Sequence, residues 1–382
     1  MNLVLFSILI IMFLKVKNTI TTIIVFFMLC YFVEVIFVEE FFSKPFSEKA
    51  ILFDSLDNIT YSLLIFTIIF YIFNYKVSDE IKFKTTFRNF KYIDIFISSI
   101  LILFAAYTYY SNTILNGGDY HMIAMNKTPL DEYLIPLITV ILIFTRGRFL
   151  VSIAFLTIAL VYGISGERLK MFMYFFTFYL IFKNSYKFIN FKFLLIVALG
   201  VAILISIYRI DLSLDTFSEM PVHISHFGEV TISSMYLIEF SSSFSIFDKI
   251  YYAIGIVLAN LLPSSLIPLD MDLKRSLIQY ARIPGGGWLP VWIYSLGGYL
   301  LVGIVSIIIS LFSRFIHIKL YKLNENSRIY TLYLSIYIMF LINMNNWFMY
   351  TPYQLFKFPI YIAIILIITY SFFAKNYHKG NI

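Results

Sequence analysis

The chain has 382 residues, of which 60% are hydrophobic and only 13% are charged, and its formal net charge is +7. Soluble domains carry roughly 25% charged residues, so the composition excludes a soluble protein, including a soluble nucleic-acid-binding protein that the positive charge alone would allow. The single cysteine, Cys30, excludes an intrachain disulfide and a cysteine metal cluster.

Long apolar runs without period-two alternation predict an all-α polytopic membrane protein, because such runs cross a bilayer as helices. A crossing helix needs about 20 apolar residues, and the first run lacks the basic region and the cleavage site of a secretory signal. We therefore expect about 11 transmembrane helices, at residues 2–14, 18–38, 58–75, 92–113, 133–145, 149–164, 167–183, 193–209, 288–312, 329–348 and 353–374.

The distribution of basic residues predicts the orientation of these spans. Alternate connecting segments gather 18 of the 29 Lys and Arg residues and only three acidic residues. Cytoplasmic segments carry the excess of Lys and Arg, so the N-terminus is expected outside the cytoplasm and the C-terminus inside.

Residues 211–287 form the one long interruption between predicted spans and are expected to be a large loop outside the cytoplasm. Within it, residues 249–269 are apolar, but one crossing there would place the basic residues that follow on the wrong side. Pro263 and Pro268 also break the run, so we expect an interfacial or re-entrant helix that ends near Leu262. No repeat or low-complexity linker divides the chain, which predicts a single transmembrane domain over residues 1–382.

Four arginines are candidates for binding a lipid diphosphate. Guanidinium groups match phosphate oxygens in a bidentate way, and ionisable residues at membrane depth are costly. Arginines at helix ends also reach toward lipid headgroups without any catalytic role, and this alternative stays open for each of them. The four are Arg168, Arg209, Arg275 and Arg282.

A histidine and glutamate series in the loop is the candidate for proton transfer. His223, His226 and Glu229 do not share one helix face, and their spacing differs from that of zinc enzymes, so we expect no metal site. Glu229 is the candidate general base for a sugar hydroxyl, with His226 as the alternative. A solvated polar loop is the competing interpretation.

Three glycines precede the predicted return to the membrane. Gly285, Gly286 and Gly287 would allow close backbone approach and offer N–H groups to an anion, or they form a flexible joint. Asp270-Met271-Asp272 has the form of a metal–diphosphate motif, which is a weak signal in so acidic a loop. Glu34 and Asp94 lie near span ends, so we expect structural roles rather than a proton relay.

These features together resemble the O-antigen polymerases, the Wzy-type oligosaccharide repeat-unit polymerases. The resemblance covers the layout of the whole chain, and Arg275 and Gly286 fit an R-x10-G spacing described for some members. It rests on many short Phe-, Ile- and Tyr-rich spans and on Ser165–Arg168, Tyr208-Arg209, Gly228-Glu229, Leu262-Pro263, Gly285–Gly287 and Gly297-Gly298-x4-Gly303.

The resemblance implies polymerisation of undecaprenyl-diphosphate-linked repeat units at the periplasmic face, for O-antigen or a related surface polysaccharide of lipopolysaccharide biosynthesis. Glu229, His226, Arg209 and Arg275 would then be catalytic, and Arg168, Arg282, His223 and the three glycines would bind substrate. No cofactor is expected, because arginines can stabilise the leaving diphosphate. Expected partners are the lipid-linked glycans, membrane lipid and a chain-length-determinant protein, with no nucleic acid.

Three other membrane functions compete with this interpretation. A flippase for the same lipid would place its charges between the spans and would not need a long outer segment. A membrane acyltransferase would need a cytoplasmic His/Arg motif, for which Lys15-Val16-Lys17 is no substitute. An O-antigen ligase, which transfers glycan to the lipid A core, shares the layout. Of the three, it is the function that sequence alone separates least well from a polymerase.

Overall fold

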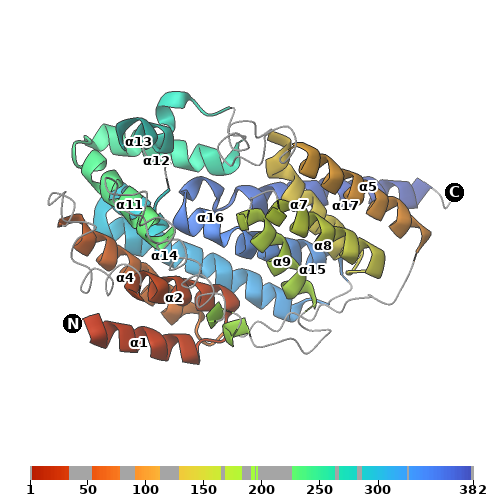
Figure 1. The fold of residues 1–382 in the computed structure, drawn as a ribbon, viewed down its shortest axis with the longest axis horizontal. Coiled ribbons are helices and arrows are strands. Elements are labelled where there is room, and N and C mark those ends of the chain that lie inside the picture. The colour runs from red at the N-terminus through yellow and green to blue at the C-terminus, as the bar shows by residue number, and fades with distance from the viewer. Residues whose placement is uncertain are drawn as a thin grey trace, which may run out of the picture. The chain divides into compact units, whose positions relative to one another are not determined.

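The computed structural model describes residues 2–33, 54–77, 91–111, 129–164, 168–182, 191–193, 195–196, 226–262, 266–281, 286–324 and 327–379. These residues form helices and contain no strand, which confirms the all-α class. Three of the described helices are long and apolar enough to cross a membrane, at Ser55–Asn74, Tyr92–Tyr109 and Leu289–Lys322. Several shorter apolar helices accompany them, so the described chain has the character of a membrane-embedded protein (Figure 1).

The chain divides into two compact units, which we describe separately. Unit 1 comprises residues 1–79, 189–317 and 344–357, and unit 2 comprises residues 80–188, 318–343 and 358–382. The expectation of a single transmembrane domain stays a prediction, and so do the number of spans and their orientation.

Unit 1 contains a buried aromatic core and three helices from the predicted loop. The core gathers around Trp288, whose ring contacts Tyr31 and Phe348 edge-on. The helices of this unit are α1 (Asn2–Lys15), α2 (Thr19–Tyr31), α4 (Asp54–Asn74), α11 (His226–Ser242), α12 (Ile246–Leu261), α13 (Leu273–Ala281), most of α14 (Leu289–Lys322) and α16 (Met344–Met349), with short 3-10 turns η5 (Leu269–Met271) and η6 (Pro352–Gln354).

Asn18 begins α2 and links it to α14. Its Oδ1 accepts the backbone N–H of Thr21 at 3.0 Å, which caps the helix. Its amide nitrogen lies 3.0 Å from Nε2 of His317, and Nδ1 of His317 lies 2.9 Å from the carbonyl oxygen of Ser313. Asn18 and His317 are both buried, so this pair satisfies polar groups inside unit 1.

Helix α14 changes direction at two adjacent glycines. Gly297 and Gly298 have non-helical backbone angles, and Gly298 has a φ of +66°. This left-handed region favours glycine because a Cβ atom is crowded there. The helix runs to Lys322, ten residues beyond the predicted end of the span. The prediction ended where the sequence becomes polar, but these polar residues still form a helix.

Unit 2 is a set of helices packed around α8. Its helices are α5 (Tyr92–Tyr109), α7 (Pro129–Phe144), α8 (Phe149–Ile164), α9 (Arg168–Phe182), the last residues of α14, α15 (Arg328–Ile342) and most of α17 (Lys357–Lys379). Helix α8 coincides with the predicted span 149–164. Both α5 and α9 pack on it, as the contact of Phe155 with Tyr174 illustrates.

The predicted span 329–348 is two helices instead of one. Helix α15 ends at Ile342, Asn343 leaves the helical conformation, and α16 begins at Met344. Asn is a poor helix former because its side chain competes for backbone hydrogen bonds. The hydropathy pattern alone could not show this break.

Candidate functional site

The first turn of α11 holds two of the predicted catalytic residues. His226 is the first residue of this helix, and Glu229 follows three residues later. Residues three apart lie on the same face of a helix. The backbone therefore places these two residues as neighbours at the N-terminal end of α11.

Trp288 fixes this end of α11 within unit 1. Its backbone N–H donates to Oγ of Ser234 at 3.0 Å, and its indole N–H donates to Oγ1 of Thr231 at 3.1 Å. Its ring stacks on Phe227 with the centroids 5.8 Å apart. Trp288, Thr231 and Ser234 are fully buried, so both hydrogen bonds satisfy groups that water does not reach.

Gly286 and Gly287 lie directly before Trp288 and are both buried. A Cβ atom on Gly286 would lie 2.9 Å from Cδ1 of Tyr350, and one on Gly287 would lie 2.9 Å from Nε1 of Trp292. These separations are too short for a methyl group. Both positions therefore require glycine, because the aromatic rings of Tyr350 and Trp292 pack directly against the backbone.

The backbone of Gly287 already has hydrogen-bond partners. Its N–H donates to the carbonyl oxygen of Tyr350 at 3.1 Å, and its carbonyl oxygen accepts the indole N–H of Trp292 at 3.1 Å. The predicted donation of this N–H to an anion is therefore replaced by a backbone bond. Close packing explains Gly287 better than a flexible joint does.

The structure brings together two predicted features that are 57 residues apart in the sequence. Thr231 and Ser234 follow Glu229 on α11 by two and five residues, and both bind Trp288, which follows the glycines. We use the name α11 site for His226, Phe227, Glu229, Gly286, Gly287 and Trp288. It combines the backbone positions of a histidine and a glutamate on one helix face with the buried ring of Trp288.

Arg275 lies elsewhere in unit 1, on the exposed face of α13. Leu273 and Leu277 bury the opposite face of this helix completely. Asp272 accepts the backbone N–H of Arg275 at 3.1 Å and so caps α13. The fold therefore leaves the guanidinium group of Arg275 on the surface.

The described contacts attach α13 to the far end of α11. Tyr280 stacks on Phe240 with the ring centroids 4.8 Å apart. The helical rise from Glu229 to Phe240 is about 16 Å at 1.5 Å per residue. The contact of α13 with Phe240 therefore lies about three helical turns along α11 from the backbone of Glu229.

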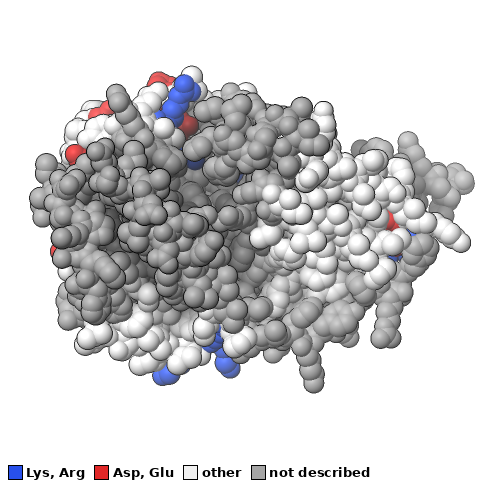
Figure 2. Space-filling model, in the orientation of Figure 1, with Lys and Arg blue, Asp and Glu red and all other residues white. Residues whose placement is uncertain are grey.

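Charged side chains gather over α12 and α13. Figure 2 shows acidic and basic side chains together there, whereas uncharged residues cover most of the other described surface in the same view. These residues are Asp248, Lys249, Asp270, Asp272, Lys274 and Arg275. An exposed surface that carries both signs of charge suits a polar ligand better than an apolar one.

Asp270 and Asp272 have structural roles in the fold. The Tyr251 hydroxyl donates to Oδ2 of Asp270 at 2.5 Å, and this bond holds the pKa of Asp270 below its ordinary value and raises the pKa of Tyr251. The bond thus persists at neutral pH and is lost only as the pH falls through that lowered pKa.

The described residues include no group of three His, Cys, Asp or Glu side chains that would hold a metal ion.

The remaining predicted site residues are placed only in part. Arg168 is the first residue of α9, in unit 2, and its side chain is outside the described set. Glu34 and the predicted site residues Arg209, His223, Arg282 and Gly285 lie outside the described residues.

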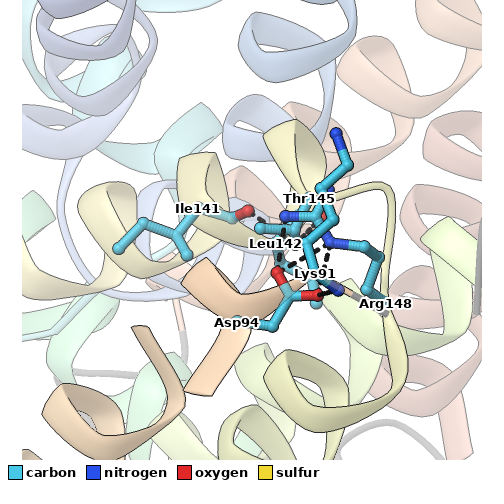
Figure 3. A network of polar contacts seen from close by, with 6 residues as sticks. All are labelled: Lys91, Asp94, Ile141, Leu142, Thr145 and Arg148. Atoms are coloured by element: carbon cyan, nitrogen blue, oxygen red, sulfur yellow. Dashed lines mark hydrogen bonds and ion pairs between the residues drawn. The ribbon is translucent and has the colours of Figure 1, made fainter. Parts of the chain in front are cut away.

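A buried ion pair in unit 2 explains Asp94. The side chain of Asp94 is 1% exposed, and both of its oxygens accept Nε–H of Arg148 at 2.8 Å, while Nη2 of Arg148 lies 2.6 Å from Oδ1 (Figure 3). Asp94 also accepts the backbone N–H of Lys91 at 2.9 Å and so caps α5. Its role is structural, as its position in the sequence predicts.

The turn before α8 positions Arg148 for this pair. Arg146 and Gly147 have positive φ values of 50° and 63°, and Thr145 Oγ1 donates to the carbonyl oxygen of Ile141 at 2.9 Å (Figure 3). A Cβ atom on Gly147 would lie 2.6 Å from Cζ of Phe182. The glycine is therefore required both by its conformation and by packing.

Sequence reasoning missed the residues that hold the α11 site together. Thr231 and Ser234 are three apart in an apolar helix, and such a spacing places two hydroxyl groups on one face. That pattern indicates a buried polar contact, but it does not identify Trp288 as the partner.

No protein-family model, curated protein or solved structure matches the chain.

Proposed function

We propose that the protein is a membrane glycosyltransferase that joins diphospholipid-linked oligosaccharide units into a surface polysaccharide at the periplasmic face of the bacterial inner membrane. The observation that supports it best is the α11 site, where the backbone places a histidine and a glutamate three residues apart on one face of a helix that packs on a buried aromatic core. Two buried hydrogen bonds to Trp288 hold the backbone of this helix, and general acid–base catalysis depends first on where the base is placed.

The proposed reaction transfers a glycan between two lipid carriers. A hydroxyl oxygen of the acceptor unit forms a bond to the anomeric carbon of the donor glycan. The bond from that carbon to the donor diphosphate breaks, and its electron pair leaves with the diphosphate. Glu229 takes the proton of the attacking hydroxyl, with His226 as the alternative base.

Arginines stabilise the leaving diphosphate in this proposal. Its negative charge increases as the bond breaks, and preorganised cations lower the energy of that state. Arg275 is exposed and available on α13, whereas the structure does not describe Arg209 and Arg282. Because Arg275 lies toward the other end of α11 from Glu229, we assign it to one end of an extended substrate.

The α11–α13 region also favours this function over transport. Residues 226–261 and 273–281 are three helices with a shared packed interface and a charged outer surface. A flippase that moves its cargo between spans does not need such a region. A glycan-joining enzyme needs it to hold two large polar substrates outside the bilayer.

The test is a Glu229→Gln variant in a reconstituted assay with lipid-linked repeat units. Glutamine keeps the size of the side chain but does not accept the proton, so we expect a folded protein that lengthens no chain. Glu239→Gln is the matched control, because Glu239 lies on the same helix against Tyr280 and should keep its activity. Equal activity of Glu229→Gln and the parent would exclude Glu229 as the base and leave His226.

A deletion strain distinguishes the polymerase from the ligase. Loss of the lipopolysaccharide ladder with one capping unit retained on lipid A supports polymerisation. Complete loss of glycan from lipid A would instead identify a ligase. The purified parent protein should also lengthen lipid-linked units in vesicles that contain no lipid A.

A further inference from the structure

Helix α12 has one face packed on the protein and an opposite face of exposed apolar side chains. Gly255, Ala259 and Asn260 are buried. The exposed face, which we call the α12 stripe, has side chains that are 46% to 83% exposed, at Ile246, Phe247, Ile250, Ile254, Val257 and Leu261.

The stripe follows from the helical repeat. Positions 246, 250, 254, 257 and 261 are separated by three or four residues, and this spacing puts all of them on one side of an α-helix. Leu262, Leu266 and Leu269 continue the exposed apolar surface just after the helix. Exposed apolar patches of this kind mark a surface that contacts a partner or a membrane.

Hydrogen bonds fix the direction in which the stripe faces. The side-chain amide of Asn260 donates to the carbonyl oxygen of Pro352 and its Oδ1 accepts the N–H of Phe356, both at 2.8 Å. At the other end, Ser245 and Asp248 cap the helix reciprocally. The stripe is thus a fixed feature of unit 1, and rotation of α12 would break both of the Asn260 bonds.

Close packing prevents α12 from turning its stripe inward. A Cβ atom on Gly255 would lie 2.2 Å from the carbonyl oxygen of Met271 in η5, so this helix face is already in contact with backbone. The Tyr251–Asp270 hydrogen bond joins the same two elements. No larger side chain fits at position 255.

Other helices of unit 1 indicate that a lipid bilayer covers the α12 stripe. The long apolar helices α4 and α14 of the same unit also expose apolar side chains, including Ile68, Ile72, Leu300 and Ile304. Long helices with apolar exposed faces are typical of membrane spans. At 16 residues α12 is about 24 Å long, which is shorter than the roughly 30 Å hydrocarbon core of a bilayer.

We infer that α12 lies parallel to the membrane surface with the α12 stripe inserted at the boundary between headgroups and acyl chains. Interfacial helices of this type insert their apolar face about 5–10 Å into that boundary. This arrangement narrows the sequence expectation of an interfacial or re-entrant helix to the interfacial one. It does not depend on the proposed function, but it would hold the charged surface of α12 and α13 at headgroup depth, where a lipid diphosphate lies.

Spin-label depth measurements test this placement. Variants that each add one cysteine, Ile250→Cys, Ile254→Cys, Val257→Cys and Leu261→Cys, would carry a nitroxide in phosphatidylethanolamine–phosphatidylglycerol vesicles. Native Cys30 is buried and the unsubstituted protein reports any background label. Collision rates with oxygen and with a water-soluble nickel chelate then give the depth of each label.

Two matched sets calibrate the result. Ser243→Cys lies just before α12 on an exposed turn and should behave as a water-accessible site. Leu300→Cys and Ile308→Cys lie eight residues apart on an apolar helix and should differ in depth by about 12 Å if α14 crosses upright. The four stripe labels are expected at one common depth of about 5–10 Å below the headgroups.

Each other outcome would overturn the inference. A depth that changes steadily along α12, as it does along α14, means a crossing or re-entrant helix. Nickel access equal to that of Ser243→Cys means that the stripe faces water. Low access to both reagents, with dipolar broadening in the fully labelled sample but not in one diluted with unlabelled protein, means that a second copy of the chain covers the stripe.

Discussion

At the scale of single residues, Gly287 illustrates how a glycine can be required by its neighbours. Trp292 Nε1 and Ser234 Oγ lie 2.9 Å and 3.4 Å from the place where a Cβ atom would stand. Both neighbours belong to the hydrogen bonds that fix the start of α14. A methyl group would therefore disturb the α11 site at Trp292 and Ser234, the residues that pack against Gly287.

We expect Gly287→Ala to lower the free energy of unfolding by about 1–3 kcal/mol, which is the usual cost of overpacking a core. The measurement is denaturant unfolding in detergent, followed by tryptophan fluorescence. Gly303→Ala is the control, because the nearest atom to its Cβ, Ile69 Cδ1, is 3.9 Å away, and alanine stabilises a helix relative to glycine by up to about 1 kcal/mol. Equal effects of the two substitutions would contradict the packing role of Gly287.

Arg275 allows a test of bidentate phosphate binding. Arg275→Ala should abolish polymerisation, and Arg275→Lys should restore it only partly, because lysine keeps the charge and loses the planar fork. Lys274→Ala removes one charge from the same helix and should have a smaller effect on initial rates of chain growth. Full activity of Arg275→Lys would show that long-range attraction is sufficient.

The site residues show what sequence reasoning can and cannot supply. Composition and spacing identified Glu229 and Gly287 as residues of interest, because polar or flexible residues stand out in an apolar chain. The link between them depends on Trp288, and tertiary contacts across 57 residues leave no periodic signal. The partner of Asp94 was missed for the same reason, since Arg148 is 54 positions away.

At the scale of elements, Asn260 joins α12 to the segment between α16 and α17. Its two polar atoms satisfy the carbonyl oxygen of Pro352 and the N–H of Phe356. Asn260 itself is only 8% exposed. Asn260 therefore contributes two of the hydrogen bonds that set the position of α12 and with it the direction of the α12 stripe.

Asn260→Ala should destabilise the protein, because each buried group left without a partner costs about 1–3 kcal/mol. Protease cleavage in the segment 351–356 should become faster. Ser276→Ala provides the control: its hydroxyl bonds only the Asp272 carbonyl of the adjacent turn, so the change should be within about 0.5 kcal/mol. Unchanged stability of Asn260→Ala would mean that other contacts suffice to hold α12.

A comparison of predicted and observed helices shows which helix ends the sequence can predict. The end of α12 at Leu261 and the match of α8 to residues 149–164 follow from local signals, a proline and a sharp change in polarity. The break at Asn343 and the kink at Gly297 and Gly298 were not predicted as such. Both interruptions occur inside apolar runs, where the average hydropathy does not change.

At the scale of the whole molecule, the distribution of charge makes a prediction about topology. Reporter fusions after Lys91, Lys192 and Lys322 should lie in the cytoplasm, and fusions at Lys49 and Asp131 should lie in the periplasm. A fusion at Ser241, near the end of α11, should also be periplasmic. This pattern follows from the excess of Lys and Arg in alternate segments.

A fusion at Arg275 separates the two possible paths of the chain. Residues 249–269 are expected not to cross the membrane, so this fusion should be periplasmic, like the one at Ser241. A cytoplasmic signal from Arg275 alone would mean that α12 crosses, and it would contradict both the proposed site and the interfacial placement of α12. A reporter with the opposite compartment requirement provides the control at each position.

The contact between Asn18 and His317 determines which imidazole nitrogen of His317 carries the hydrogen atom. The carbonyl oxygen of Asn18 is occupied by the Thr21 N–H, so its NH₂ group faces His317 and can only donate. Nε2 of His317 must then carry a lone pair, and the single ring proton resides on Nδ1, directed at Ser313. One asparagine thereby selects the tautomer of a buried histidine, and an Asn18→Asp substitution would replace its donor with an acceptor that Nε2 of that tautomer cannot bond.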